Sequence, residues 1–303
     1  MSCFRTDRER LPALPEGKTP LAEDAADEDS LPSLAETIER LRMEHEAKAG
    51  RDYSGGGNPG FANLLATVIR NAELPEELGQ RIRAAAESPA FILDLLICLE
   101  GDRHLRALVD KQHPLPQAYV PADLAALKEA SYRVNRGDLM LRAAAAVSLE
   151  EMAAAALGEG VTLVASSAFR SYEYQVEVYS RVVREMGQEA ADRESARPGF
   201  SQHQTGLVVD FGSIDNSFAG TRAGRWMAAN ASRFGWSLSF PDGYEAVTGY
   251  RWESWHYRYV GRDLAAFIDT YFGGIQQYAL RFIHEWEKAY SGISKTPSSM
   301  CLG

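Results

Sequence analysis

The segment GLVVDF, at residues 206–211, constrains the fold of this chain more than any other. Its apolar, β-branched run is typical of a buried strand. Asp210 lies inside this run, and His203 stands just ahead of it although the chain has only six histidines. A second segment, RWESWHYR at 251–258, also combines strand-like residues with ionisable ones. The two segments together indicate one polar site built on strands.

The remaining patterns predict an α+β fold. Strands are expected in VTLVASSAF (161–169), GWSLSFP (235–241) and WHYRYVG (255–261), and helices at about 138–157 and 171–187. Because these elements do not alternate as regular βαβ units would, we predict a small antiparallel sheet with flanking helices that carry a metal site. A helical N-terminal region precedes this sheet.

The chain divides into four predicted parts. Residues 1–32 are proline-containing and acidic, and we expect a flexible leader. Residues 33–107 form a helical accessory region. Residues 108–272 form the main domain, and residues 273–303 form a C-terminal helix and tail.

Local signals place the helices of the accessory region. Ser33 begins a capping-box pattern, and helices are expected at 61–72, 75–87 and 89–100. The proline-rich segment that opens the main domain follows an extended path, after which a helix is expected at Ala122.

Composition excludes some partners. The 303 residues carry a net charge of -10, and the isoelectric point is near 5.2. Nucleic acid is therefore not the expected partner, since phosphate binding needs clustered Lys and Arg. The longest apolar run, at 90–100, is short and interrupted by Asp94, which favours a buried helix over a membrane span.

Three scattered cysteines are too few for a disulfide framework. Cys98 lies in the apolar run at 90–100, and we expect a buried thiol. Cys3 precedes a long polar segment, which fits either a lipid-anchored N-terminus or an ordinary surface thiol. The sequence leaves both interpretations open, and Cys301 has no assigned role.

His203, Asp210 and His256 are the candidate metal ligands. A catalytic zinc takes three protein ligands and leaves one position for water. Two imidazoles and one carboxylate suit this ion. Gly206 allows the tight turn between the first two ligands.

Two further residues would complete a hydrolytic site. Glu253, three residues before His256, is the expected general base, and burial between Trp252 and Trp255 would raise its pKa. Arg170, directly after a predicted strand, would stabilise negative charge on the attacked carbonyl oxygen or bind a substrate carboxylate. Both roles stay open at this point.

Ser171 and Gln175 are expected either to hydrogen-bond the substrate or to hold Arg170. Taken alone, each candidate also has a structural interpretation: His203 as a hydrogen-bonded residue beside a strand, Asp210 as a strand-end cap. The constellation SxHxxGxxxD, followed some forty residues later by ExWHxR, carries the functional hypothesis.

This constellation resembles the VanY-type zinc D-alanyl-D-alanine carboxypeptidases, whose fold is shared with the D-Ala-D-Ala dipeptidases and the Hedgehog signalling domain. The resemblance covers about residues 108–270. It is carried by the segments KQHPLPQAYVPADL, SAFRSYEYQ, SQHQTGLVVDF and ESWHYRYVG. Ala168, Phe169 and Val208 depart from the residues common in the family, without removing a catalytic group.

The resemblance implies one zinc ion per chain on His203, Asp210 and His256, with Glu253 as base and Arg170 assisting. Further matches to the motif frame, or implied substrate contacts, are Ser171, Gln175, Ser201, Gly206, Trp255 and Arg258. No family is identified for residues 1–107, which we expect to modify specificity or to dock a partner.

The implied activity is that of a zinc metallopeptidase acting on peptidoglycan stem peptides. Removal of the terminal D-Ala from a D-Ala-D-Ala end is the first choice; an LD-carboxypeptidase and a cross-link endopeptidase are alternatives. A non-catalytic, Hedgehog-like zinc-binding module is the contrasting hypothesis, and the presence of Glu253 and Arg170 argues against it. The substrate implies a location in the periplasm or at the cell surface, with Cys3 as one means of tethering to a membrane.

Overall fold

The computed structural model describes residues 59–294. The expected leader at 1–32, the capping box at Ser33 and the cysteines Cys3 and Cys301 lie outside the described residues. The elements follow one another in the order α2 (Pro59–Asn71), α3 (Glu76–Ala85), α4 (Pro89–Glu100), β1 (Leu124–Ala126), β2 (Arg133–Val134), β3 (Met140–Arg142), α5 (Ala143–Gly158), β4 (Val164–Ser167), α6 (Tyr172–Met186), α7 (Gln188–Glu194), η1 (Gln202–Thr205), β5 (Val208–Phe211), η2 (Asn216–Gly220), α8 (Arg222–Asn230), η3 (Ala231–Phe234), β6 (Trp236–Leu238), α9 (Glu245–Thr248), β7 (His256–Tyr259), α10 (Arg262–Phe272) and α11 (Gln276–Ser294).

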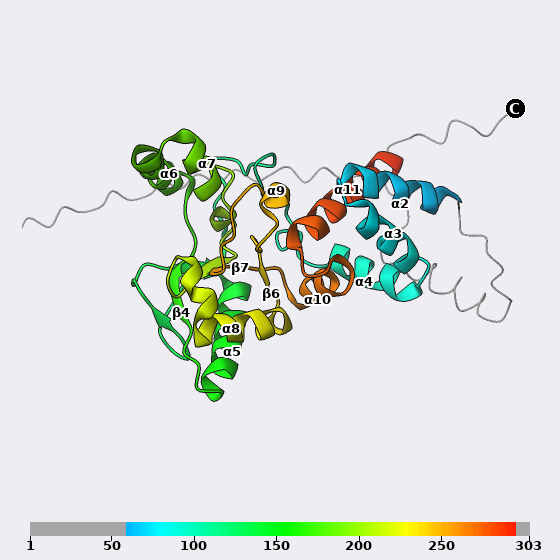
Figure 1. Ribbon diagram of the computed structural model, residues 1–303. Coiled ribbons are helices and arrows are strands. Elements are labelled where there is room, and N and C mark those ends of the chain that lie inside the picture. The colour runs from blue at the N-terminus through cyan, green and yellow to red at the C-terminus, as the bar shows by residue number, and fades with distance from the viewer. Residues whose placement is uncertain (1–58, 295–303) are drawn as a thin grey trace, which may run out of the picture.

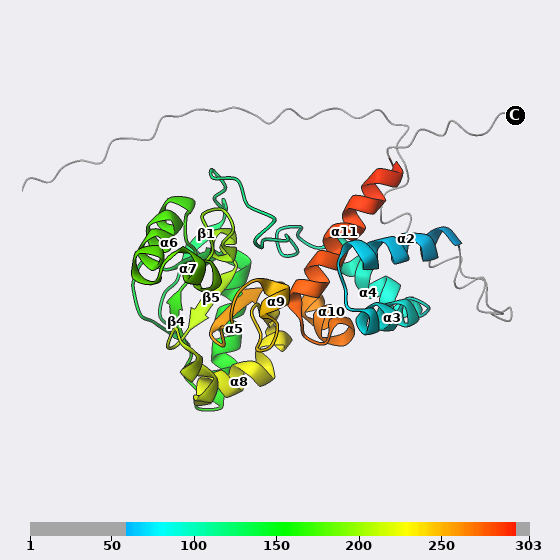
Figure 2. The same ribbon diagram turned by 45° about the horizontal axis from the view of Figure 1, so that its top comes forward.

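These elements gather into two lobes (Figure 1). The sheet lobe holds the strands with α5 and α8, and the helical lobe holds α2, α3, α4, α10 and α11; Figure 2 shows the same division from a second direction. Each lobe has its own cluster of buried apolar side chains. The N-terminal helices thus share a core with the two C-terminal ones.

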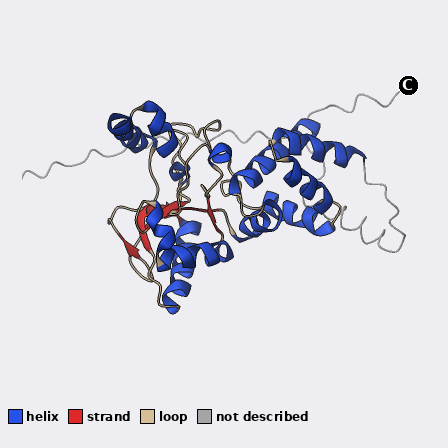
Figure 3. Ribbon diagram, viewed as in Figure 1, coloured by secondary structure: helices blue, strands red, loops and turns tan. Residues whose placement is uncertain are grey.

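Five strands form the main sheet, in the order β2-β4-β5-β7-β6. Figure 3 shows these strands in red, with helices around them. β2 pairs with β4 in parallel, and the other three pairs are antiparallel. The central strand β5 is buried along its whole length, as its apolar sequence predicts. The predicted α+β fold with a small, mainly antiparallel sheet is confirmed.

Helix α5 packs into the core of the sheet lobe through small side chains. Ala145, Ala153 and Ala156 are fully buried on this helix. Small side chains allow close approach of the helix to its neighbours. On the same face, the Ser148 hydroxyl accepts a hydrogen bond of 3.0 Å from the Trp236 indole of β6. The alanine-rich composition therefore serves tight packing as well as helix propensity.

In the opening part of the main domain, one helix prediction is wrong and another helix begins later than expected. No helix begins at Ala122; instead β1 pairs antiparallel with β3 in a separate two-stranded sheet. The helix expected from residue 138 begins only at Ala143, because residues 140–142 belong to that pairing. Helix propensity favours both stretches, but cross-strand partners available only in the folded chain override it.

Aromatic side chains hold the helical lobe together. The Phe91 ring of α4 lies 5.6 Å from Phe267 of α10 and 6.2 Å from Phe282 of α11, measured between ring centroids. At the other end of the lobe, Phe61 of α2 meets Trp286 of α11 at 5.9 Å. The three predicted accessory helices are present. Among the helices of residues 59–294, none has both the length and the apolar character needed to cross a membrane.

Helix α10 is an element that the sequence analysis did not identify. It lies before the expected boundary between residues 272 and 273, whereas α11 lies after it. Both helices contribute to the core of the helical lobe, for example through Ile268 and Phe282. The four-part division of the chain stays a prediction, and the packing shows which of its helices associate.

Arg258, a residue of the expected motif frame, connects the two lobes. Its side chain is fully buried on β7, and Nη2 donates to the backbone carbonyls of Leu105, at 3.1 Å, and Ala107, at 2.8 Å. Those carbonyls belong to the segment that leads from α4 into the sheet lobe. Burial lowers the pKa of this guanidinium to about 10.

Candidate metal centre

His203, Asp210 and His256 converge at the centre of the sheet. One ligand atom from each lies within 4.8 Å of the others. His203 Nε2 is 3.2 Å from Asp210 Oδ2, and His256 Nδ1 is 3.2 Å from Asp210 Oδ1. All three side chains are buried. The residues that the sequence proposed as a ligand set are thus brought together.

Local structure accounts for the position of each ligand. Asp210 and His256 are directly opposed in the β5–β7 pairing. His203 lies in η1, where Ser201 is the N-cap and its hydroxyl accepts from the His203 amide at 3.3 Å. Gly206 ends η1 with φ +69°, a left-handed conformation that favours glycine. The expected tight turn at Gly206 is therefore present.

Each imidazole has one nitrogen engaged outside the centre. His203 Nδ1 donates to the Ala168 carbonyl at 2.7 Å, which leaves Nε2 facing Asp210. His256 Nε2 faces the Gln202 side-chain oxygen at 3.4 Å, which leaves Nδ1 facing Asp210 and Glu253. The two histidines thus present different nitrogens, Nε2 and Nδ1, to the same space.

The donor set fits a zinc ion. Asp210 Oδ1 is buried and accepts no hydrogen bond from the described residues, and such an atom is costly unless something compensates it. A divalent cation would supply that compensation. Two imidazole nitrogens and one carboxylate oxygen form a recurrent set of protein ligands for catalytic zinc, with a further coordination position left open.

Electrostatics favour a charged Asp210 in the centre. Burial by itself would raise the pKa of its carboxyl, but the two facing imidazoles hold that pKa well below its usual range. Burial lowers the pKa of His203. Burial would lower the pKa of His256, but Asp210 and Glu253 raise it to about 9. Without a metal the centre therefore offers an anionic oxygen and one neutral imidazole, and metal binding would release a proton from His256.

Glu253 lies beside the centre. Its Oε2 is 3.3 Å from His256 Nδ1, and its backbone amide donates to the Phe240 carbonyl at 3.0 Å. Burial raises the pKa of the Glu253 carboxyl, in the direction expected from the sequence. Trp252 is only half-buried, and Trp255 belongs to the core of the sheet lobe.

Arg170 follows β4 and is held in place by hydrogen bonds. Nη1 donates to Gln175 Oε1 at 2.8 Å, and Nη2 donates to Ser167 Oγ at 3.2 Å. Burial lowers the pKa of this guanidinium, whereas the carboxylates of Asp210 and Glu253 raise it. Arg170 is therefore a cation that feels both carboxylates of the site.

Gln175 takes the second of the two roles that the sequence left open, which is to hold Arg170. Its side chain is almost fully buried, and its Nε2 donates to the Ala196 carbonyl at 2.6 Å. That bond fixes Oε1 toward the guanidinium. The described contacts of Gln175 therefore hold the Arg170 guanidinium in place.

The other expected substrate contacts have local structural partners. The Ser171 hydroxyl caps α6 by accepting from the Tyr174 amide at 3.1 Å. Ser201 caps η1 as described above. Trp255 exposes only 4% of its surface and packs in the core of the sheet lobe. Direct contacts of Ser171, Ser201 and Trp255 with a substrate stay predictions.

Three buried polar residues near His256 were missed by the sequence analysis: Gln202, Ser239 and Gln276. Gln202 lies between the motif positions Ser201 and His203, and this placement was the available signal. Ser239 and Gln276 come from β6's C-terminal side and from the start of α11. Nothing in their local sequence connects them to the ligands.

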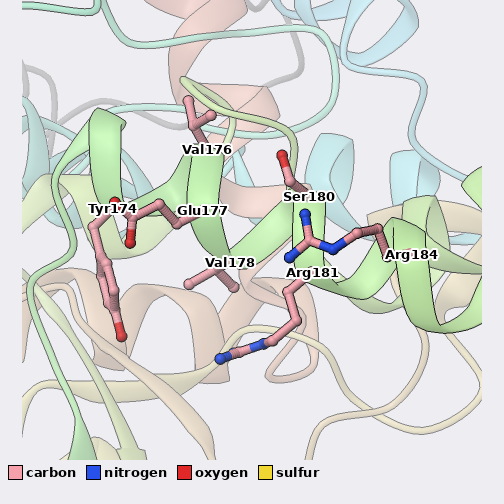
Figure 4. A pocket seen from close by; sticks show the side chains of 7 residues that line it. All are labelled: Tyr174, Val176, Glu177, Val178, Ser180, Arg181 and Arg184. Atoms are coloured by element: carbon pink, nitrogen blue, oxygen red, sulfur yellow. The ribbon is translucent and has the colours of Figure 1, made fainter.

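A hollow of about 460 Å³ lies along α6 and not at the ligands. Figure 4 shows Tyr174, Val178 and Arg181 on one side of this helix and Val176 on the other. None of the three candidate ligands lines this hollow. The hollow is therefore separate from the ligand cluster.

The fold and the ligand cluster define a zinc metallopeptidase. Residues 138–262 match the family described as VanY: D-alanyl-D-alanine carboxypeptidase. YodJ of Bacillus subtilis (strain 168), a protein assigned as a carboxypeptidase, is 35% identical over 218 residues, which cover 68% of this chain and 80% of YodJ. The chain belongs to the VanY D-alanyl-D-alanine carboxypeptidase family.

Two solved structures agree with this assignment. The LdcB LD-carboxypeptidase, whose structure reveals the basis of its peptidoglycan recognition, is 33% identical, with a TM-score of 0.51 over 56% of this chain and 86% of LdcB. A vancomycin-resistance D,D-pentapeptidase VanY variant in complex with Zn(II) is 29% identical, with a TM-score of 0.50 over 58% of this chain and 99% of VanY. Zinc is accordingly the cofactor that the ligand cluster fits.

Proposed function

We propose that this enzyme removes the terminal D-Ala from peptidoglycan stem peptides, with the D-Ala-D-Ala bond of a pentapeptide stem as the first choice. The observation that carries the proposal is the position of Glu253 Oε2, 3.3 Å from the ligand His256, with the Arg170 guanidinium near both carboxylates. A zinc site that served recognition alone would need neither residue. The family relatives supply the substrate class.

Each residue has a defined part in the proposed reaction. Zinc, when bound, polarises water and the scissile carbonyl. Glu253 would accept the proton of the water as its oxygen forms a C–O bond with the scissile carbonyl carbon, and would then return that proton to the D-Ala amine as the C–N bond breaks. Burial raises the pKa of Glu253 and so makes it a stronger base than an exposed carboxylate.

Arg170 would contribute a fixed positive charge. Its two hydrogen bonds, to Gln175 and Ser167, hold the guanidinium before substrate arrives, and such preorganisation favours the charge that develops in the transition state. The same fork suits the terminal carboxylate of a D-Ala residue. Ser171, Ser201 and Trp255 are retained as proposed substrate contacts through their place in the family's motif frame.

The preferred stem length distinguishes two related activities. The likeness to LdcB supports tetrapeptide stems and LD-cleavage, whereas the VanY relatives support pentapeptide stems and DD-cleavage. Synthetic stems of both lengths, incubated with zinc-loaded enzyme and analysed by mass spectrometry, separate the two. Loss of one alanine from the pentapeptide alone supports the proposal, and loss from the tetrapeptide alone replaces it by an LD-carboxypeptidase.

The Glu253→Ala variant tests the mechanism. We expect one bound zinc per chain, unchanged folding and a loss of hydrolysis of at least about 100-fold, the lower end of a general base's contribution. Hydrolysis at the wild-type rate would contradict the assigned base. If wild-type enzyme with one zinc cleaves neither stem, cross-linked dimers test the endopeptidase alternative, and binding without cleavage would favour the non-catalytic module.

The proposed substrate places the enzyme outside the cytoplasm, in the periplasm or at the cell surface. Tethering through Cys3 stays a proposal, and the residue lies outside the described range. Mass spectrometry of protein isolated from native membranes tests it, and an unmodified Cys3 would exclude the tether. Residues 1–107 are proposed to dock a partner or to modify specificity.

A further inference from the structure

Gln202 lies directly behind the ligand His256. Its Oε1 is 3.4 Å from His256 Nε2, on the side of the ring away from Asp210. Because a carbonyl oxygen can only accept, this contact favours a proton on Nε2. The lone pair is then on Nδ1, which faces Asp210 and Glu253.

A second contact fixes the orientation of Gln202. The Ser239 hydroxyl donates to the same Oε1 at 2.8 Å. The same hydroxyl proton also faces Gln276 Oε1 at 3.4 Å, as the longer branch of a three-centre hydrogen bond. Gln276 Nε2 in turn donates to the Ser237 carbonyl at 3.3 Å. The chain of contacts from His256 therefore runs through Gln202 and Ser239 to Gln276.

All three polar residues behind His256 are buried, with exposures of 5% for Gln202, 2% for Ser239 and 1% for Gln276. Buried polar groups are destabilising unless they are hydrogen-bonded. Apolar packing could fill this space without such a cost. The polar network therefore calls for a role in the site that it adjoins.

Gln276 connects the polar network behind His256 to the helical lobe. It is the first residue of α11, and α11 packs against α2 and α10 in the helical lobe (Figure 2). The first side chain of α11 thus contacts the hydroxyl that orients Gln202: Gln276 Oε1 lies 3.4 Å from Ser239 Oγ.

We propose that Gln202 is a positioning residue that fixes the tautomer and ring orientation of His256 for zinc binding, and that α11 supports it through Gln276. The helical lobe thereby stabilises the metal centre from behind. The inference rests on the proposed use of the cluster as a zinc site. Residues that hydrogen-bond a metal-ligating histidine generally set its basicity and orientation in this way.

Zinc affinity of the full-length protein tests the proposal directly. We compare Gln202→Met, which keeps the volume and removes the acceptor, with Gln202→Glu, which keeps an oxygen at that position. Zinc dissociation constants are measured by competition with a chromogenic chelator. We expect about 10–100-fold weaker binding for Gln202→Met, and affinity at least equal to wild type for Gln202→Glu.

Two substitutions at the start of α11 form a matched pair. Gln276→Met breaks the contact with Ser239. Gln277→Met, at the next position, breaks the 2.7 Å hydrogen bond that Gln277 Nε2 donates to Asp110. We expect Gln276→Met to weaken zinc binding about 3–10-fold. This effect is smaller than that of Gln202→Met, because Gln276 does not contact His256 directly. Gln277→Met should remain close to wild type. Equal effects of the two would overturn the role of Gln276.

A spectroscopic readout separates positioning from general stability. In the apo-protein, at a pH high enough for His256 to be neutral, ¹⁵N-labelled imidazole shifts report which nitrogen of His256 carries the proton. We expect the Nε2–H tautomer in wild type and a mixture in Gln202→Met. Wild-type zinc affinity together with an unchanged tautomer would overturn the proposal.

If Gln202→Met fails to fold, Ser239→Ala replaces it, with weaker zinc binding expected and wild-type affinity as the contradicting result. None of these measurements uses a peptide substrate. A wild-type enzyme that cleaves no stem peptide would therefore count against the proposed function and leave this inference intact.

Discussion

Asp210 lies directly opposite His256 in the antiparallel β5–β7 pair, with Oδ1 3.2 Å from Nδ1. The strand register alone therefore sets the distance between a carboxylate and an imidazole ligand. A slip of one residue would turn either side chain to the other face of the sheet. The rigid part of the metal centre is thus its two central strands.

Removing this carboxylate should remove the metal. For Asp210→Ala we expect zinc affinity to fall by at least about 100-fold, because one of three protein ligands and its negative charge are lost. Zinc per chain after dialysis against a weak chelator measures the effect. Asp242→Ala, at an exposed aspartate on the loop before α9, is the control and should retain one zinc.

Gly206 is expected to be irreplaceable for two separable reasons. It has φ +69°, and an added Cβ would lie 2.9 Å from Leu124 Cδ2 and 3.1 Å from Arg142 Cγ. We expect Gly206→Ala to lower the free energy of unfolding by about 2–4 kcal/mol, from backbone strain and crowding together.

The control for Gly206 has the same backbone conformation in open space. Gly273 has φ +63°, and a Cβ there would meet no atom within 4 Å. Gly273→Ala should therefore cost only about 1 kcal/mol, the strain alone. Urea unfolding of both variants measures the difference, and equal losses would show that crowding at Gly206 contributes nothing.

Asp110 should make folding sensitive to acid. Burial would raise the pKa of its carboxyl, but bonds from the Gln112 amide, His113 and Gln277 lower it overall. Because the folded-state pKa is below the unfolded one of about 3.9, the unfolded chain binds more protons at low pH. The stabilisation is present above about pH 4 and is lost as pH falls through the folded-state pKa.

The Asp110→Asn variant isolates this effect. At pH 7 we expect its free energy of unfolding to be about 2 kcal/mol below wild type, the size of hydrogen bonds to a charged group. The difference should shrink as pH falls from about 5 to about 3. A difference that stays constant over that range would contradict the assigned pKa direction.

Cys98 should be unreactive in the folded protein. Burial raises the pKa of its thiol to about 12, and only 6% of the residue is exposed. In a variant with Cys3→Ser and Cys301→Ser, we expect alkylation at pH 8 about a thousandfold slower than for a free thiol of pKa about 8.5. Unfolding with urea should restore the ordinary rate, and fast labelling without urea would show that α4 opens.

The sequence by itself determined the candidate ligands of the site. His203, Asp210 and His256 could be identified because the chemistry of zinc restricts ligands to a few residue types and the motif spacing is local. Gly206 could be identified for a similar reason, since a tight turn has its own residue preference. Buried strands such as β5 can be recognised from their mainly apolar, β-branched residues.

Only the tertiary structure decided what surrounds those ligands. Gln202, Ser239 and Gln276 become neighbours of His256 through contacts between residues distant in the chain. The strand β1 replaces an expected helix because β3 offers it a partner. Likewise, α10 and α11 pack against the N-terminal helices because this packing buries apolar and aromatic side chains of both groups. Local sequence does not show which helices meet. Local sequence patterns indicate the candidate ligands and the helix or strand propensity of each segment. Packing between distant segments decides which other residues contact those ligands.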